Sequence, residues 1–203
     1  MLQSDQLVNS LELDPKQIAQ SSDCQQALLS KISPKQVEPG EKKKPTAFDW
    51  VLSRIKDGTD VAVPREMIHF YSEVRSNQLR RMETGESTSE YPQLFDAQAF
   101  RDAWPKVSET RLTQTIYAEY SDVKGWLEAL RTAKATQDAV SLQEIWNVCE
   151  SETHQRISRL LEIGFFKQKK EQGRFVYWVP FLYRPGLEMV QGSAEGVRER
   201  AQE

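Results

Sequence analysis

The chain has 203 residues, a net charge of −3 from 27 basic and 30 acidic side chains, and 38% hydrophobic residues. Its apolar content can supply the core of one domain or two small ones, whereas the near balance of charge excludes a general electrostatic attraction to nucleic acid or anionic lipid. The sequence lacks a signal-peptide pattern and has no run of roughly 18 apolar residues, the length that a membrane span needs. We therefore expect a cytoplasmic protein with no membrane partner.

Residues 1–46 predict weakly specified helices followed by a linker. Asp14 and Pro15 suit the N-cap and first position of a short helix, and a second helix can begin near Ser22. The stretch 33–46 contains three prolines, a glycine and a run of lysines, which is typical of a loop.

Residues 47–134 predict a helical, lid-like bundle. Thr46 can cap a helix that ends near Gly58, and Pro64 can begin a second helix that reaches about Met82. Each helix has apolar residues at spacings of three and four, so each should bury one face. These inward residues are Phe48, Val51, Leu52 and Ile55 in the first helix and Met67, Phe70, Tyr71 and Val74 in the second.

The second half of this bundle follows a polar loop over residues 85–91. A helix begins at Phe95, and Pro105 should close it because proline has no amide hydrogen and disfavours helix in the residue before it. Ser108 then caps a further helix, and another with Trp126 inward leads to a connection over 133–139.

Residues 135–192 predict a winged helix, which is a helix-turn-helix followed by a β-hairpin. An amphipathic helix is followed, after Glu150-Ser151, by a second helix that should end at Gly164, since glycine adopts the left-handed C′ conformation without strain. Two strand-like runs over 165–169 and 174–179 then form a small antiparallel β-hairpin. The apolar faces of the two helices are Leu142, Ile145, Trp146 and Cys149, and Ile157, Leu160 and Leu161. Residues 193–203 form a polar tail.

The chemistry of a self-sufficient enzyme is absent from the sequence. None of the nine glycines is followed by lysine, so there is no phosphate-binding P-loop. The two histidines, His69 and His154, lie on different predicted helices and cannot form a multi-histidine metal site. Cys149 falls on an apolar helix face and Cys24 is far away in sequence, so we expect reduced, buried thiols rather than a disulfide or a metal site.

Two blocks of sequence carry a family resemblance. The block Asp57-Gly58 followed by Pro64-Arg65-Glu66, and the block YWVPFLYRP at 177–185, are its most specific parts, within a likeness that spans 24–192. Together they resemble the C-terminal half of a family of bacterial P-loop ATPases of the STAND/AAA-like type. In that family a nucleotide-binding domain is followed by a helical lid and a winged helix, so the resemblance implies a lid and winged helix without the ATPase core.

The resemblance also gives Arg65 a specific hypothesis. An arginine in the first turn of a lid helix implies a sensor that reaches the γ-phosphate of bound nucleotide. The alternative is an ordinary salt bridge, for example with Asp57.

The winged helix leaves two kinds of partner open. Its exposed basic and polar side chains could contact nucleic acid, but six basic residues meet five acidic ones over 141–180, and a nearly neutral module gains little from phosphate contacts. We therefore favour docking to a protein surface, either on another protein or within this chain. The candidate contact residues for either partner are His154, Gln155, Arg156, Arg159, Lys167, Lys169, Lys170 and Arg174.

The sequence thus predicts a mainly α protein: a helical lid-like bundle followed by a winged helix with a small antiparallel β-hairpin. We expect a regulatory or interaction module that is no enzyme by itself and binds no cofactor alone. ATP and Mg²⁺ would enter only with a separately encoded P-loop ATPase core, and the chain could also be an inactive remnant of such a protein. The alternative is a winged-helix DNA-binding regulator.

Overall fold

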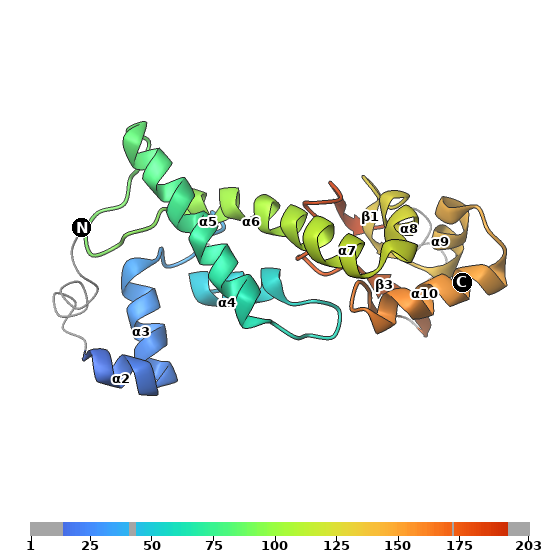
Figure 1. Cartoon of the computed structure of the whole chain (residues 1–203), viewed down its shortest axis with the longest axis horizontal. Coiled ribbons are helices and arrows are strands. Elements are labelled where there is room, and N and C mark those ends of the chain that lie inside the picture. The colour runs from blue at the N-terminus through green and yellow to red at the C-terminus, as the bar shows by residue number, and fades with distance from the viewer. Residues whose placement is uncertain (1–13, 41–43, 172, 195–203) are drawn as a thin grey trace. The chain divides into compact units, whose positions relative to one another are not determined.

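The computed structural model describes residues 14–40, 44–171 and 173–194. These residues are mainly helical, with a small mixed sheet towards the C-terminus (Figure 1), so the predicted fold class is confirmed. They form two compact units. The first unit is Met1–Leu52 with Phe70–Ala103, and the second is Ser53–His69 with Trp104–Glu203. The predictions for residues 1–13 and for most of the polar tail lie outside the described residues.

The first unit begins with two short helices, α2 (Pro15–Gln20) and α3 (Ser22–Ile32). The Asp14 side chain accepts a hydrogen bond from the Lys16 amide at 2.9 Å, so the predicted N-cap is confirmed. The unit also includes the first part of α4 (Ala47–Ile55), whose predicted cap Thr46 accepts from the Asp49 amide at 3.1 Å.

The core of the first unit is aromatic. It uses α5 (Pro64–Glu83) from Phe70 onward and α6 (Ala97–Arg111) as far as Ala103. The Phe70 ring centroid lies 6.1 Å from that of Trp50 and 6.5 Å from that of Phe100, and all three side chains are at most 1% exposed. Such ring pairs stabilise a core beyond the area that they bury.

A buried carboxylate holds the polar loop between α5 and α6. Asp96 accepts hydrogen bonds from the Thr88 amide and hydroxyl, and its own amide donates to the Gln78 side chain at 2.8 Å. Burial alone would raise the pKa of Asp96, but hydrogen bonds from Ser87, Thr88 and Gln78 outweigh it and lower the pKa. The loop is therefore anchored by a charged, satisfied side chain.

The prediction that Pro105 closes a helix is wrong. Helix α6 continues to Arg111 and runs into a π-helical turn, η1 (Leu112–Ile116), and then α7 (Tyr117–Glu119). The proline costs this helix one backbone hydrogen bond, but buried residues on both sides of it, Ala103 and Val107, hold the helix together. Ser108 is consequently no N-cap: it is buried, and its hydroxyl accepts from the Gly186 amide at 2.9 Å.

The remaining elements of the second unit follow the layout of a winged helix. After η2 (Ser121–Val123) and α8 (Lys124–Glu128), strand β1 precedes two helices and a hairpin, and a last strand follows. The bounds are β1 (Lys134–Gln137), α9 (Ala139–Trp146), α10 (Glu150–Glu162), β2 (Lys167–Glu171), β3 (Arg174–Trp178) and β4 (Val190–Ser193). The strand order is β2-β3-β1-β4, with β3 antiparallel to both β2 and β1 and with β4 parallel to β1.

Local signals set the ends of the two winged-helix helices. Asp138 and Ser141 form a reciprocal capping box at the start of α9. Asn147 ends α9 in the left-handed conformation at φ 50°, and Gly164 follows α10 at φ 71°, as predicted for glycine. The break therefore lies at residues 147–149, before the predicted Glu150-Ser151.

This position of the break corrects the prediction for Cys149. The residue is the N-cap of α10 and is exposed, because α9 ends one turn earlier than the apolar spacing suggested. Both cysteines are free thiols, and Cys24 is half-buried. The connection predicted over 133–139 is also wrong in part, since it contains β1.

Candidate functional site

A polar pocket of about 250 Å³ lies at the start of α5 in the second unit. Side chains from the first two turns of α5, from the end of α6 and from the π-turn η1 line it. They are Arg65, Glu66, His69, Val107, Thr110, Arg111, Gln114 and Thr115. A π-turn inserts a residue into a helix and is frequent at functional sites, and here it supplies Gln114 and Thr115 to the pocket.

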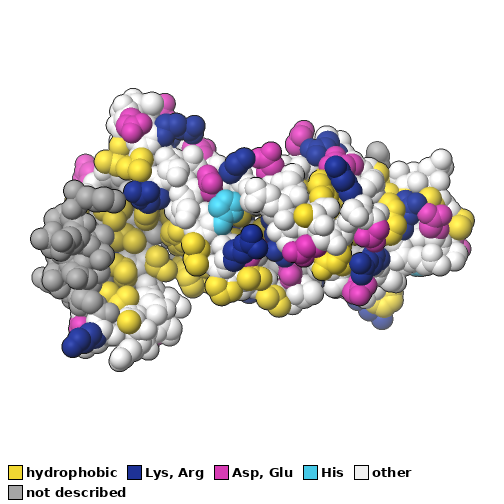
Figure 2. All heavy atoms as spheres, in the orientation of Figure 1, with side chains coloured by type: hydrophobic (Ala, Val, Ile, Leu, Met, Phe, Trp, Pro, Cys, Tyr) yellow, Lys and Arg dark blue, Asp and Glu magenta, His cyan; other side chains and the backbone are white. Residues whose placement is uncertain are grey.

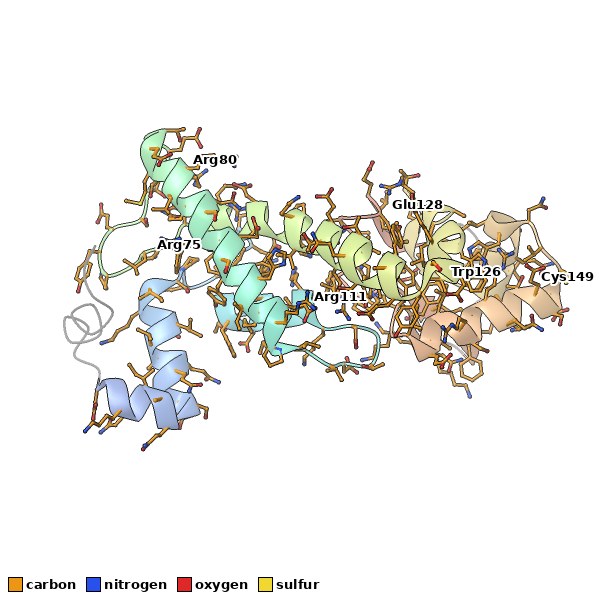
Figure 3. All side chains as sticks on the ribbon, viewed as in Figure 1. Arg75, Arg80, Arg111, Trp126, Glu128 and Cys149 are labelled. Atoms are coloured by element: carbon orange, nitrogen blue, oxygen red, sulfur yellow. The ribbon has the colours of Figure 1, made fainter. Side chains whose placement is uncertain are left out.

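An ion pair forms one wall of this pocket. Arg111, which is labelled in Figure 3, donates from Nη1 to Glu66 Oε1 at 2.8 Å, and Glu66 is only 7% exposed. Burial disfavours the charged form of Arg111, but the neighbouring Tyr183 and Glu66 outweigh it and raise the Arg111 pKa. Burial in turn raises the pKa of Tyr183 to about 12, which keeps its hydroxyl protonated. The two charges of the pair therefore cancel.

Two atoms of this ion pair keep unused hydrogen-bonding capacity. Glu66 Oε2 and Arg111 Nε are buried and have no hydrogen-bond partner among the described residues. A buried polar atom without a partner costs free energy. The two charges of the pair thus balance each other, but two of its buried polar atoms make no hydrogen bond to a described residue.

Arg65 is the arginine of the pocket that no described acidic side chain neutralises. Its side chain is exposed and forms no ion pair with any residue that the structure describes, so the alternative salt bridge with Asp57 is not formed. The Glu66–Arg111 pair adds no net charge beside it. The pocket therefore combines one available guanidinium group with hydroxyl and amide donors, which is the chemistry that binds an anion.

The predicted contact residues on α10 are largely engaged within the chain. Arg156 pairs with Glu152, and its guanidinium carbon lies 5.1 Å from the Trp126 ring centroid and 5.8 Å from that of Trp146. A guanidinium group held over aromatic faces is part of the packing. Arg156 therefore has little capacity left to contact a ligand.

Arg159 is the other cation of α10. It pairs with Glu162 at 2.8 Å and with Asp122 at 3.6 Å, and neighbouring charges of this kind offset most of its attraction for phosphate. His154 and Gln155 are exposed beside a shallow hollow that also involves Arg159 and Glu162. Acidic and basic side chains are interspersed over this part of the visible surface (Figure 2).

Of the four basic residues of the β-hairpin, two interact with other side chains of the chain and two are exposed. Lys167 pairs with Asp60, and the Lys169 ammonium lies 4.3 Å from the Trp178 ring centroid, where burial lowers its pKa. Lys170 and Arg174 are exposed and form no ion pair with any described residue. Their neighbour Phe175, which is 54% exposed, pairs with Lys170 across the strands.

The block YWVPFLYRP has a structural role that the sequence does not reveal. Arg184 is 4% exposed, and its guanidinium carbon lies 4.6 Å from the Trp178 ring centroid and 4.2 Å from that of Phe181. Burial and the nearby charge of Arg54 lower the pKa of Arg184 to about 10. This stack packs the strand β3 against the segment after it.

Comparison of the chain with protein-family models, with curated protein sequences and with solved structures finds no match. Within the ranges that the structure describes, no cluster of three or more histidine, cysteine or acidic residues could hold a metal ion. No described helix has the length and apolar content needed to cross a membrane. The pocket and the winged-helix surface are the two candidate functional sites of the described residues.

Proposed function

We propose that the chain is a regulatory module that docks on another protein and reads the presence of a phosphate through Arg65. The partner would be a P-loop ATPase core in another chain, which would supply ATP and Mg²⁺, as the resemblance in sequence implies. The observation that carries this proposal is the unpaired Arg65 at a polar pocket whose other arginine is neutralised by Glu66. In this proposal the chain acts in the cytoplasm and has no catalytic activity of its own.

The pocket suits a phosphate group held by a partner better than a whole nucleotide. A single guanidinium group with hydroxyl and amide donors can bind a phosphate oxygen, whereas tight nucleotide binding uses a glycine-rich loop that this sequence does not contain. The coupling to a partner would arise because Arg65 stands in the first turn of α5, so a bound phosphate would bias the position of that helix.

The probe for this site is inorganic tripolyphosphate, titrated into ¹⁵N-labelled protein and followed by NMR. We expect saturable shifts in the amides of α5 and η1, with a Kd of about 1 mM, which corresponds to about −4 kcal/mol. Arg65→Ala should weaken binding by about tenfold or more, the size of one charge-assisted contact. Lys106→Ala, an exposed cation paired with Glu109 on α6, is the matched control and should leave the titration unchanged.

Equal titrations of wild type and Arg65→Ala would refute the phosphate-reading role of Arg65. Hydrolysis of ATP by the pure chain, lost on Arg65→Ala, would refute the proposal that catalysis needs a partner.

Nucleic-acid binding is the second candidate, and the exposed Lys170, Arg174 and Phe175 on the hairpin favour it. Two available cations give only a small release of counterions. We therefore expect duplex DNA to bind with a Kd weaker than about 10 µM at 150 mM salt, which is within the non-specific range. A tighter Kd in fluorescence anisotropy, lost in Lys170→Glu/Arg174→Glu, would instead favour the DNA-binding regulator.

A further inference from the structure

Two basic and two apolar side chains share the outward face of α5 in the first unit. Leu79 and Met82 are 45% and 60% exposed, and Arg75 and Arg80 are exposed as well. At about 100° per residue, Leu79 lies between the two arginines around the helix axis and Met82 lies beside Arg75. Figure 3 shows both arginines on this helix. We call these four residues the basic-apolar face.

The opposite side of the same helix is fully used by the core. Phe70, Val74 and Gln78 are at most 3% exposed. The basic-apolar face is therefore not an unfilled part of the interior. Leu79 and Met82 are three residues apart and are therefore neighbours on the helix surface, where they can form the apolar centre of a small interaction surface flanked by charge.

The two arginines lack the acidic partners that their neighbours have. Arg81 pairs with Glu86 at 3.3 Å and with Asp96 at 3.4 Å. Arg75 and Arg80 form no ion pair with any residue in the described ranges, although Glu83 is exposed nearby. Glu83 lies between Leu79 and Arg80 around the helix axis, so the outward face carries two positive charges outside any ion pair and one negative charge, which leaves an excess of positive charge.

We infer that the basic-apolar face docks an acidic amphipathic helix of a partner protein. Apolar residues of such a helix would cover Leu79 and Met82, and its flanking carboxylates would pair with Arg75 and Arg80. A nucleic-acid backbone would satisfy the arginines but leave the apolar side chains without apolar contact. A second copy of this face would bring like charges together, which costs affinity.

Two synthetic helical peptides of about 18 residues test this inference by fluorescence anisotropy. Both carry the same leucine stripe, flanked by glutamate in one and by lysine in the other. We expect the glutamate peptide to bind with a Kd of about 10–100 µM and the lysine peptide to bind about tenfold or more weakly. Leu79→Ser/Met82→Ser should weaken binding of the glutamate peptide by a similar factor.

Charge reversal gives the sharper result. Arg75→Glu/Arg80→Glu should lose the glutamate peptide and bind the lysine peptide instead, whereas Lys16→Glu/Lys35→Glu, a matched reversal of two exposed lysines in the same unit, should change neither. Circular dichroism checks that each variant keeps its fold.

Three outcomes would overturn the inference. The first is that neither peptide binds, or that both bind with equal affinity. The second is a dimer in analytical ultracentrifugation that Leu79→Ser/Met82→Ser dissociates, which would assign the face to a second copy of the chain. The third is binding to phosphatidylserine vesicles that the arginine reversal removes while binding to the glutamate peptide persists, which would assign the arginines to a membrane surface.

Discussion

Replacement of Gly58 by alanine should destabilise the second unit by about 3 kcal/mol, the upper end of the usual cost of overfilling a close-packed site. The loop after α4 approaches the turn between α10 and β2 so closely that the Gly58 amide donates to the Gly164 carbonyl at 2.6 Å. A Cβ at residue 58 would lie 2.8 Å from that carbonyl oxygen and closer still to the Phe166 carbonyl oxygen. Both obstacles are backbone atoms, so a change of rotamer cannot relieve the clash.

Urea denaturation followed by tryptophan fluorescence measures this effect, and Gly125→Ala is the control. Gly125 lies in α8 with open space where a Cβ would stand, and its φ is not positive. Alanine there should be neutral or stabilise by up to about 1 kcal/mol, the difference in helix propensity. If both variants have the same stability, the loop is not held against the turn as the distances indicate.

The Gly58 contact also shows what the sequence could not predict. The sequence predicts a helix end near Gly58 and a glycine C′ residue at Gly164, because both signals are local. That the two turns meet depends on how distant segments pack, and one sequence holds no signal for such a contact. The same reason explains Arg156, whose stacking depends on Trp126 and Trp146 from other elements.

The same difference between local and distant signals separates the elements that the sequence predicts from those that it does not. Helix α10 and the hairpin β2–β3 are predictable because their apolar spacing and glycine turns are visible in the sequence. Strands β1 and β4 are not, because KATQ and VQGS are short and polar and gain their pairing only from the assembled sheet. Pro105 misleads the prediction because burial on both sides of the proline overrides a local rule.

The sequence points to the candidate pocket only through Arg65. The other residues of the pocket come mainly from the end of α6 and from η1, and a π-turn has no marker in this sequence. Glu66 and Arg111 are far apart in the chain, so their ion pair could not be inferred from spacing. The charge balance of the site, on which the proposed anion binding depends, is therefore a result of the structure alone.

Replacement of Arg111 by methionine should cost about 3–5 kcal/mol, the usual penalty for breaking a buried ion pair from one side. Methionine keeps most of the apolar volume but leaves the Glu66 carboxylate, 7% exposed, with no opposite charge at 2.8 Å. Urea denaturation followed by tryptophan fluorescence measures this loss of stability.

The double variant Arg111→Met/Glu66→Met separates the ion pair from the anion site. Replacing both charges by apolar groups of similar volume is often neutral or stabilising, so the double variant should recover most of the stability that Arg111→Met loses. Because the pair contributes no net charge, tripolyphosphate binding through Arg65 should stay within about threefold of wild type, well under 1 kcal/mol. A stable double variant that no longer binds tripolyphosphate would show that Arg111, rather than Arg65 alone, holds the anion.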